Sequence, residues 1–138
     1  MRKRKGFTLV EIMIVVFIIA LLSAIAIPNL LRARITANES AAQTALRILS
    51  TCIETYATVN NDNYAPVDNT TTDTYLRTVT PPYLNKAYCA QTVNGYTYTC
   101  DIDLAAYSIT ATASPCGTSG NTNFTITTGG VLTQAACS

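Results

Sequence analysis

Glu11 is the side chain whose surroundings most clearly point to chemistry, because it lies inside the apolar run of residues 7–27. A charged side chain in the middle of a membrane helix costs roughly 2.5–3.5 kcal/mol, and less near the interface, so such a residue usually has a partner. The basic cluster at residues 2–5 is a loose partner within reach. A chain cut before Phe7 would supply another, since its new amine would lie one helical turn from Glu11.

The five cysteines are the second set of reactive side chains, and the chain contains no histidine. Without histidine it lacks the commonest metal ligand and the usual base at neutral pH. No C-x-x-C pair occurs, which argues against zinc binding and against a thioredoxin-type redox motif. In an exported domain such cysteines are expected to form disulfides. They are Cys52, Cys89, Cys100, Cys116 and Cys137.

The carboxylates other than Glu11 offer little for catalysis or metal binding. A Ser-His-Asp set is impossible without histidine, and the candidate acids lie among turn-forming residues, at Asp62, Asp68, Asp73, Asp101 and Asp103. Asp101 and Asp103 come nearest to a calcium site, but Ca²⁺ takes six to eight oxygen ligands and residues 104–138 carry no carboxylate side chain. We therefore expect no enzyme activity, no cofactor and no bound metal.

The composition describes a membrane segment attached to one small domain. The chain has 138 residues, of which 49% are hydrophobic and 12% charged, with a formal net charge of +1. This balance is too apolar for a disordered chain and too poor in charge for an ordinary soluble surface. Without residues 1–6, five basic and eight acidic side chains remain. The body is therefore mildly acidic, and we expect no nucleic-acid binding.

The apolar run of residues 7–27 is long enough to cross a membrane, because a helix of this length spans about 30 Å. The basic residues before it should stay in the cytoplasm, which places the rest of the chain outside. Two other interpretations fit the composition. The run could be a secretory signal peptide cut near residues 23–26, or it could be a plain membrane anchor. Neither explains Glu11.

A second helical pattern follows Pro28. Small or apolar side chains recur in steps of three and four, which indicates one face of an amphipathic helix. We expect one helix from about Phe7 to about Val59, bent near Pro28, with a sheet covering one side of its second half. The turn-forming residues 60–63 should end it. The face consists of Ala41, Ala42, Ala45, Leu46, Leu49, Cys52, Ile53 and Tyr56.

The remainder of the chain has the period-2 alternation of β-strands with one covered face. The alternating segments are residues 96–100, 107–113 and 124–127. Asn94-Gly95 and Gly129-Gly130 are hairpin turn sequences. We therefore predict an α+β fold, in which an antiparallel sheet of about four strands packs on the helix.

The first of these turns also predicts a disulfide. If Asn94-Gly95 is a two-residue turn, Val93 faces Tyr96 and, further along the ladder, Cys89 faces Cys100. Opposed residues of an antiparallel pair have Cα atoms about 4.5–5.5 Å apart, which is within the range for a disulfide. Other pairings, and cysteines that are simply buried thiols, stay open.

The segment from Lys5 to Glu11, KGFTLVE, resembles the class III signal of type IV pilins and type II secretion pseudopilins. The resemblance is tight over residues 2–34 and general beyond them. It implies cleavage between Gly6 and Phe7 by a prepilin peptidase, with Gly6 as the minimal side chain before the cut, and N-methylation of Phe7. Glu11 corresponds to the family's buried acidic residue, which would pair with the Phe7 amine of a neighbouring copy. Pro28 matches the proline at which pilin helices commonly bend.

The resemblance further implies the type IV pilin fold, with a cleaved cytoplasmic leader at residues 1–6, a transmembrane and filament-core helix at 7–28, and an extracytoplasmic head at 29–138. A disulfide between Cys116 and Cys137 would close the C-terminal region, as one does in many pilins, and Cys52 would stay reduced. The chain is then expected to be a pilus subunit that is stored in the inner membrane and later assembled into an extracellular or periplasmic filament.

The partners that this resemblance implies are other copies of the chain, minor pilins, the prepilin peptidase and methyltransferase, and an inner-membrane assembly platform. A separate ATPase would supply the energy, because the sequence contains no phosphate-binding loop. The alternative within the same family is a pseudopilin of a type II secretion system. A membrane-tethered enzyme is a third hypothesis, which the missing histidine disfavours.

Overall fold

A computed structural model of the chain describes residues 6–64, 74, 76–78 and 80–138. The basic residues 2–5 and the two loop acids Asp68 and Asp73 lie outside the described residues. The chain forms two compact units, Met1–Ala33 and Arg34–Ser138. We call the second unit the head.

The helix α1 runs without interruption from Leu9 to Val59, close to the expected bounds. It passes through Pro28, and the bend expected there stays a prediction. The helix ends where Asn61 and Asp62 adopt positive φ angles of 56° and 58°, a left-handed conformation that short polar side chains tolerate. The Asp62 N–H donates to the Ala57 carbonyl at 3.0 Å, which satisfies one of the free carbonyls at the helix end.

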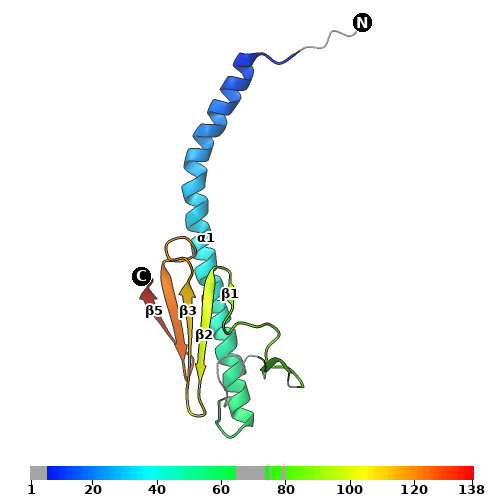
Figure 1. Ribbon diagram of the computed structural model, residues 1–138, viewed down its shortest axis with the longest axis vertical. Helices are drawn as coiled ribbons and strands as arrows, with labels where there is room; N and C mark the ends of the chain where they lie inside the picture. Colours follow the sequence, from blue (N-terminus) through cyan, green and yellow to red (C-terminus); the bar gives the residue numbers. More distant parts are fainter. Residues whose placement is uncertain (1–5, 65–73, 75, 79) are drawn as a thin grey trace. The chain divides into compact units, whose positions relative to one another are not determined.

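The sheet has five strands, one more than expected, and its neighbouring strands are antiparallel in the order β1-β2-β3-β4-β5 (Figure 1). The additional strand is the two-residue β1, which is too short to show an alternating pattern in the sequence. The strands are β1 Thr92–Val93, β2 Tyr96–Ile102, β3 Tyr107–Ala113, β4 Thr122–Thr127 and β5 Val131–Ala136.

Two glycine-containing turns set the order of neighbouring strands. Asn94 and Gly95 both have positive φ, 52° and 75°, and Val93 pairs with Tyr96, as a two-residue type I′ hairpin requires. Gly129 and Gly130, with φ of 80° and 74°, belong to a longer connection, because Thr127 pairs with Val131. Both turn sequences therefore form hairpins, with different loop lengths.

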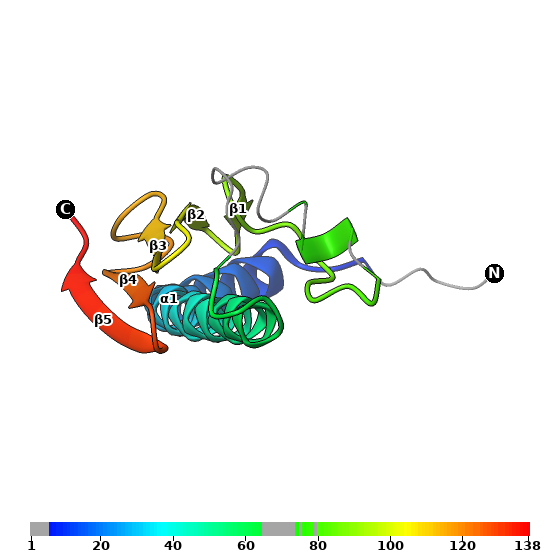
Figure 2. The ribbon, with the colours of Figure 1, turned by 90° about the horizontal axis from the view of Figure 1, so that it is seen from below.

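One face of the sheet packs on one side of α1 and forms the core of the head (Figure 2). Tyr96, Tyr98 and Cys100 point inward from β2, whereas the threonines between them are more exposed. Full burial of a side chain such as Leu46 or Ile53 contributes roughly 1.5–3 kcal/mol. The apolar face of α1 and the inward side chains of the strands together form one hydrophobic core. The buried residues of α1 are Ile35, Ala42, Ala45, Leu46, Leu49, Ser50, Ile53, Tyr56 and Ala57.

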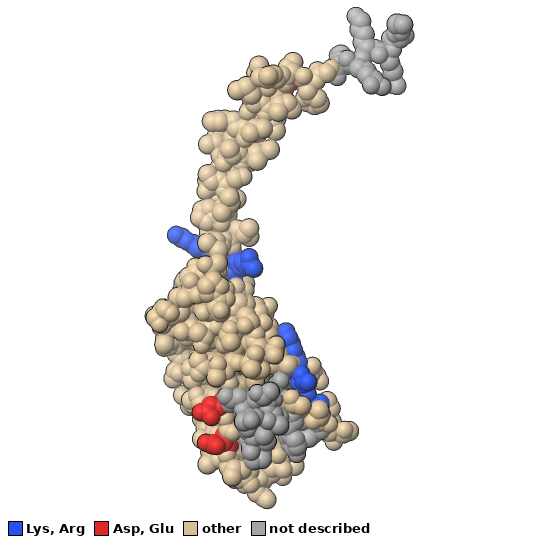
Figure 3. All heavy atoms as spheres, in the orientation of Figure 1, with Lys and Arg blue, Asp and Glu red and all other residues tan. Residues whose placement is uncertain are grey.

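The opposite face of the sheet is lined largely by threonine hydroxyl groups. A row of threonines crosses four strands, because Thr99 pairs with Thr110, Thr110 with Thr125 and Thr125 with Thr133. Residues 104–138 carry no charged side chain at all, and blue and red spheres are accordingly sparse on the face of the head in Figure 3.

Candidate functional site

The N-terminus of α1 is organised by Thr8 and Glu11. The Thr8 backbone N–H and the Thr8 hydroxyl both donate to Glu11 Oε2, at 2.8 and 2.7 Å. The Glu11 N–H lies 3.3 Å from Thr8 Oγ1 and donates to it. This reciprocal arrangement is a capping box, which satisfies donors that the first turn of a helix leaves free. The spacing Thr-x-x-Glu is the sequence signature of this motif. Thr8 is the site residue that was not predicted from the sequence.

The capping box gives the two carboxylate oxygens of Glu11 different hydrogen-bonding states. Both bonds from Thr8 end on Oε2, and Oε1 accepts no hydrogen bond from any described residue. Among the described residues, one oxygen is therefore satisfied and the other is left for a further donor. An amine within hydrogen-bond distance of Oε1 would make a charge-assisted bond, which is stronger than a neutral one.

The bond that a peptidase would cut is accessible. Phe7 is 86% exposed, and a Cβ added to Gly6 would meet no atom within 4 Å. The packing of the chain therefore does not require glycine at position 6.

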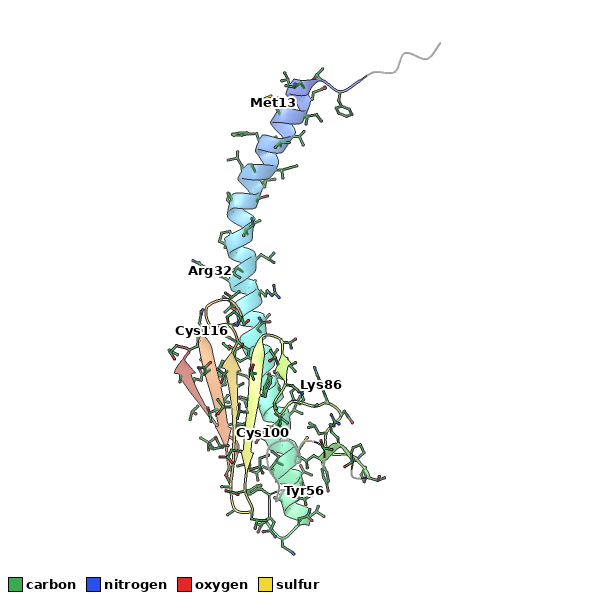
Figure 4. The ribbon with its side chains drawn as sticks, viewed as in Figure 1. Met13, Arg32, Tyr56, Lys86, Cys100 and Cys116 are labelled. Atoms are coloured by element: carbon green, nitrogen blue, oxygen red, sulfur yellow. A yellow bond between two sulfur atoms is a disulfide. The ribbon has the colours of Figure 1, made fainter. Side chains whose placement is uncertain are left out.

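The first part of α1 is an apolar surface without a partner in the chain. From residue 7 to residue 31, every leucine, isoleucine, valine, methionine and phenylalanine is between 43% and 86% exposed; Met13 is labelled among them in Figure 4. Among the described residues, α1 is the one helix long and apolar enough to cross a membrane. A soluble protein rarely exposes so large a contiguous apolar surface, which indicates contact with lipid or protein.

Two disulfides close the head, and they join the pairs named from the sequence. Cys89 is bonded to Cys100 with Cα atoms 5.5 Å apart, and Cys116 to Cys137 with Cα atoms 5.8 Å apart; Cys100 and Cys116 are labelled in Figure 4. Cys52 is a free thiol whose Sγ donates to the Tyr83 carbonyl at 2.8 Å.

The prediction that Cys89 lies directly opposite Cys100 in the ladder was wrong. The ladder holds for only two pairs, Val93 with Tyr96 and Thr92 with Thr97. Ala90 then adopts a φ of 58°, and Cys89 forms a bridge with Tyr98 instead of lying opposite Cys100. The disulfide still forms, because the bridge to Tyr98 keeps Cys89 beside β2, the strand that carries Cys100.

Glu54 joins α1 to the end of the sheet where β3 begins and where the chain turns from β4 to β5. Its Oε1 accepts from the Tyr107 hydroxyl at 2.9 Å and from the Gly129 N–H at 2.8 Å, and its Oε2 accepts from the Tyr64 hydroxyl at 3.3 Å. The Tyr107 hydroxyl also lies 2.7 Å from Ser50 Oγ. Burial raises the pKa of Tyr107 to about 12, with Glu54 acting in the same direction.

We call the hydrogen bonds of Glu54 the first polar clamp. A second polar clamp joins α1 to the loop between β3 and β4. The Asn38 side-chain amide donates to the Ser119 carbonyl at 2.9 Å, and the Asn121 N–H donates to Glu39 Oε1 at 2.8 Å. The disulfide at Cys116 closes the same loop. Neither clamp had a signal in the sequence, because the partners lie far apart along the chain.

The aspartates considered for metal binding or catalysis do not gather into a site. Asp101 and Asp103 line one small hollow of about 130 Å³ together with Tyr107 and Ser108. Asp62 lies in the turn after α1. Within the described part of the chain, no three histidine, cysteine, aspartate or glutamate side chains are close enough to hold a metal ion.

Comparison with known proteins points to the N-terminal motif. A family profile described as "Prokaryotic N-terminal methylation motif" matches residues 1–27. No solved structure matches the chain.

Three curated relatives cover about half of the chain. The type IV wide pilus major component PilA4 of Thermus thermophilus is 48% identical over 61 residues, which are 44% of this chain and 47% of that protein. The type IV major pilin protein PilA of Myxococcus xanthus is 40% identical over 49% of this chain and 30% of its own length. The type II secretion system core protein G of Vibrio cholerae is 37% identical over 49% of this chain and 46% of its own length.

The chain therefore spans less than half the length of each of these relatives. The methylation motif, the α+β fold with its long N-terminal helix, and the three relatives agree with one another. Together they show that the chain is similar to type IV pilins and to a type II secretion core protein over about half of its length.

Proposed function

We propose that this chain is a structural subunit of a type IV pilus-like filament and not an enzyme. It is cut between Gly6 and Phe7, methylated on the Phe7 amine, and polymerised through the first part of α1. The observation that carries this proposal is the exposed apolar first part of α1, which has Glu11 in its first turn. The pilus relatives, which include major pilins by name, support the same function.

Lipid and filament both provide an apolar environment for residues 9–31, so moving this helix between them gains little hydrophobic free energy. Close packing and polar pairs must therefore favour the filament. Glu11 is the one charged side chain between Phe7 and Arg32. Burying it without a full set of hydrogen-bond partners costs free energy. Pairing it with another copy is thus a reason to assemble.

The capping box makes this pairing specific. Thr8 occupies Glu11 Oε2, and the Phe7 amine of a neighbouring copy binds Oε1. The amine exists only after the leader is removed, so an uncut precursor lacks the donor. Cleavage is thereby a prerequisite for assembly. Because the packing around Gly6 leaves its Cβ position open, the peptidase is what requires a glycine there.

The remaining partners follow from this life cycle. The precursor lies in the inner membrane with residues 1–6 in the cytoplasm and the head outside. A prepilin peptidase and methyltransferase process it, an inner-membrane platform with a separate ATPase extracts it, and minor pilins join it in the filament. Pro28 bends or loosens the helix there.

The test is to shear filaments from the source cells and sequence the assembled subunit by mass spectrometry. We expect a mature chain that begins with N-methylated Phe7. Assembled material that retains Met1 would exclude the proposal.

The secretion relative keeps a second function under consideration, a pseudopilin of a type II secretion system. The two functions predict different losses when the gene is deleted. Loss of surface filaments with normal protein secretion supports the pilus. Loss of secreted enzymes with unchanged surface filaments supports the pseudopilin.

A further inference from the structure

The strand β5 is an open edge of the sheet. Among the described residues it pairs with β4 alone, and in Figure 2 it lies outermost on one side of the head. Leu132 is half-buried and the other five residues of the strand are exposed, so side chains on both faces of β5 meet solvent. The outer side of an edge strand carries a row of backbone N–H and C=O groups that can pair with another strand.

This edge lacks the features that usually prevent an edge strand from pairing. Those features are charged side chains, proline, a bulge or a covering helix. Residues 131–136 contain no proline, and no charged side chain occurs anywhere in residues 104–138. The ladder between β4 and β5 is continuous from Val131 to Ala136, so no bulge interrupts it. At the opposite edge β1 has only two residues. The sheet can therefore be extended at β5.

The side chains of β5 favour an identical strand as the partner. Thr133 ends the row of threonines that begins at Thr99 and crosses β3 and β4. If a second β5 pairs antiparallel with the first and Thr133 lies opposite its own copy, the row continues into the second sheet. Threonine pairs across strands are favourable, whereas a charged strand would find no opposite charge on this edge. The same register places Val131 opposite Ala135, so side chains of the same face meet.

We propose that β5 of one head pairs with β5 of a second copy, antiparallel and centred on Thr133, and joins the two sheets into one. The two strands exchange backbone hydrogen bonds, as in other cases where a strand is added to an open sheet edge. The inference rests on the proposed function and adds a contact to it, because it joins two filaments and plays no part in building one.

The symmetry of the contact determines where it forms. The same strand takes part on both sides, so the contact is isologous and closes on a pair. A two-fold axis relates the two heads, and their α1 helices therefore run in opposite directions. Copies polymerised through α1 into one filament point the same way and cannot form it. The contact thus joins heads of neighbouring antiparallel filaments, where many weak contacts along the length add up to a stable bundle.

A matched pair of lysine substitutions tests the contact. Thr133 and Thr99 are both exposed and lie in the same row, but Thr99 is on β2, away from the edge. Thr133→Lys places two like charges opposite each other, and we expect the bundled fraction of sheared filaments to fall at least about fivefold. Thr99→Lys adds the same charge to the same face and should leave that fraction within about twofold of wild type. Low-speed sedimentation and negative-stain electron microscopy measure the bundled fraction.

Disulfide trapping tests the register. Opposed Cα atoms of an antiparallel pair are about 4.5–5.5 Å apart, which is within the range for a disulfide. The variants carry Cys52→Ser, which removes the free thiol. On mild oxidation of bundles, Thr133→Cys should give covalent dimers joined through position 133 of both chains, whereas Thr99→Cys should stay monomeric.

Three results would overturn the inference: wild-type filaments that do not bundle, bundling that the two lysine substitutions change equally or not at all, or no dimer joined through position 133. An unchanged yield of Thr133→Lys filaments shows that the head folds and that the subunit assembles. All of these results leave the proposed function standing, because the methylated Phe7 terminus of wild-type filaments tests it separately.

Discussion

Tyr107→Phe removes one hydroxyl from the centre of the head. That hydroxyl donates to Glu54 Oε1 at 2.9 Å and lies 2.7 Å from Ser50 Oγ, and Tyr107 is 3% exposed. A hydrogen bond to a charged group contributes roughly 1.5–3 kcal/mol, and a buried polar atom without a partner costs roughly 1–3 kcal/mol. Glu54 keeps the Gly129 N–H, so we expect the free energy of unfolding to fall by about 2–3 kcal/mol.

Tyr64→Phe is the matched control, since it removes another hydroxyl that donates to the Glu54 carboxylate. The Tyr64 bond is longer, 3.3 Å, and it ends on the other oxygen, so we expect a loss below about 1 kcal/mol. Urea unfolding of the full chain in detergent micelles, followed by the near-ultraviolet circular dichroism of the tyrosines, measures both. If Tyr107→Phe cost no more than Tyr64→Phe, the Glu54 network would not be what holds α1 to the sheet.

Four other perturbations have definite expected outcomes. Glu11→Gln keeps a capping side chain but loses the charge, so sheared filaments should fall roughly 10- to 150-fold, for a lost bond of about 1.5–3 kcal/mol. Cys116→Ser opens a disulfide of sequence separation 21 and should lower the unfolding free energy by about 3 kcal/mol in the same urea assay. Gly120→Ala would press its Cβ against the Tyr96 hydroxyl and should cost about 1–3 kcal/mol there. Raising the pH from 10 through 12 should unfold the head, measured by far-ultraviolet circular dichroism, because the unfolded chain loses tyrosine protons before the folded one does. Burial raises three tyrosine pKa values to about 12, those of Tyr96, Tyr98 and Tyr107.

The parts of the fold that could be read from the sequence are those set by local periodicity. The bounds of α1 followed from its apolar pattern and from the turn formers at residues 60–63, and the inward residues of β2 followed from alternation. The two-residue β1 has no such pattern. The positive φ of Ala90 also gave no sign, because alanine does not mark a left-handed position as glycine or asparagine does.

The polar clamps could not be read from the sequence for a different reason. Glu54 meets Gly129, and Glu39 meets Asn121, across 75 and 82 residues of sequence. Nothing near either glutamate along the chain indicates that partner, because the sheet is what brings the partners together. The capping box lies at the opposite extreme. Thr8 and Glu11 are three residues apart, so their Thr-x-x-Glu spacing is enough to predict the contact.

The capping box lowers the free-energy cost of placing the Glu11 carboxylate in an apolar environment. An isolated carboxylate in an apolar phase would need its whole solvation replaced by a neighbour. Here two donors from Thr8 already reach Oε2, so the monomer in the membrane carries a partly satisfied acid. In the proposed precursor, these bonds keep the first turn of the helix folded while the chain is stored in the membrane. In the function proposed above, assembly adds a donor for Oε1, and only a copy whose leader has been removed brings it. Under that proposal, Glu11 is the residue that distinguishes processed from unprocessed subunits.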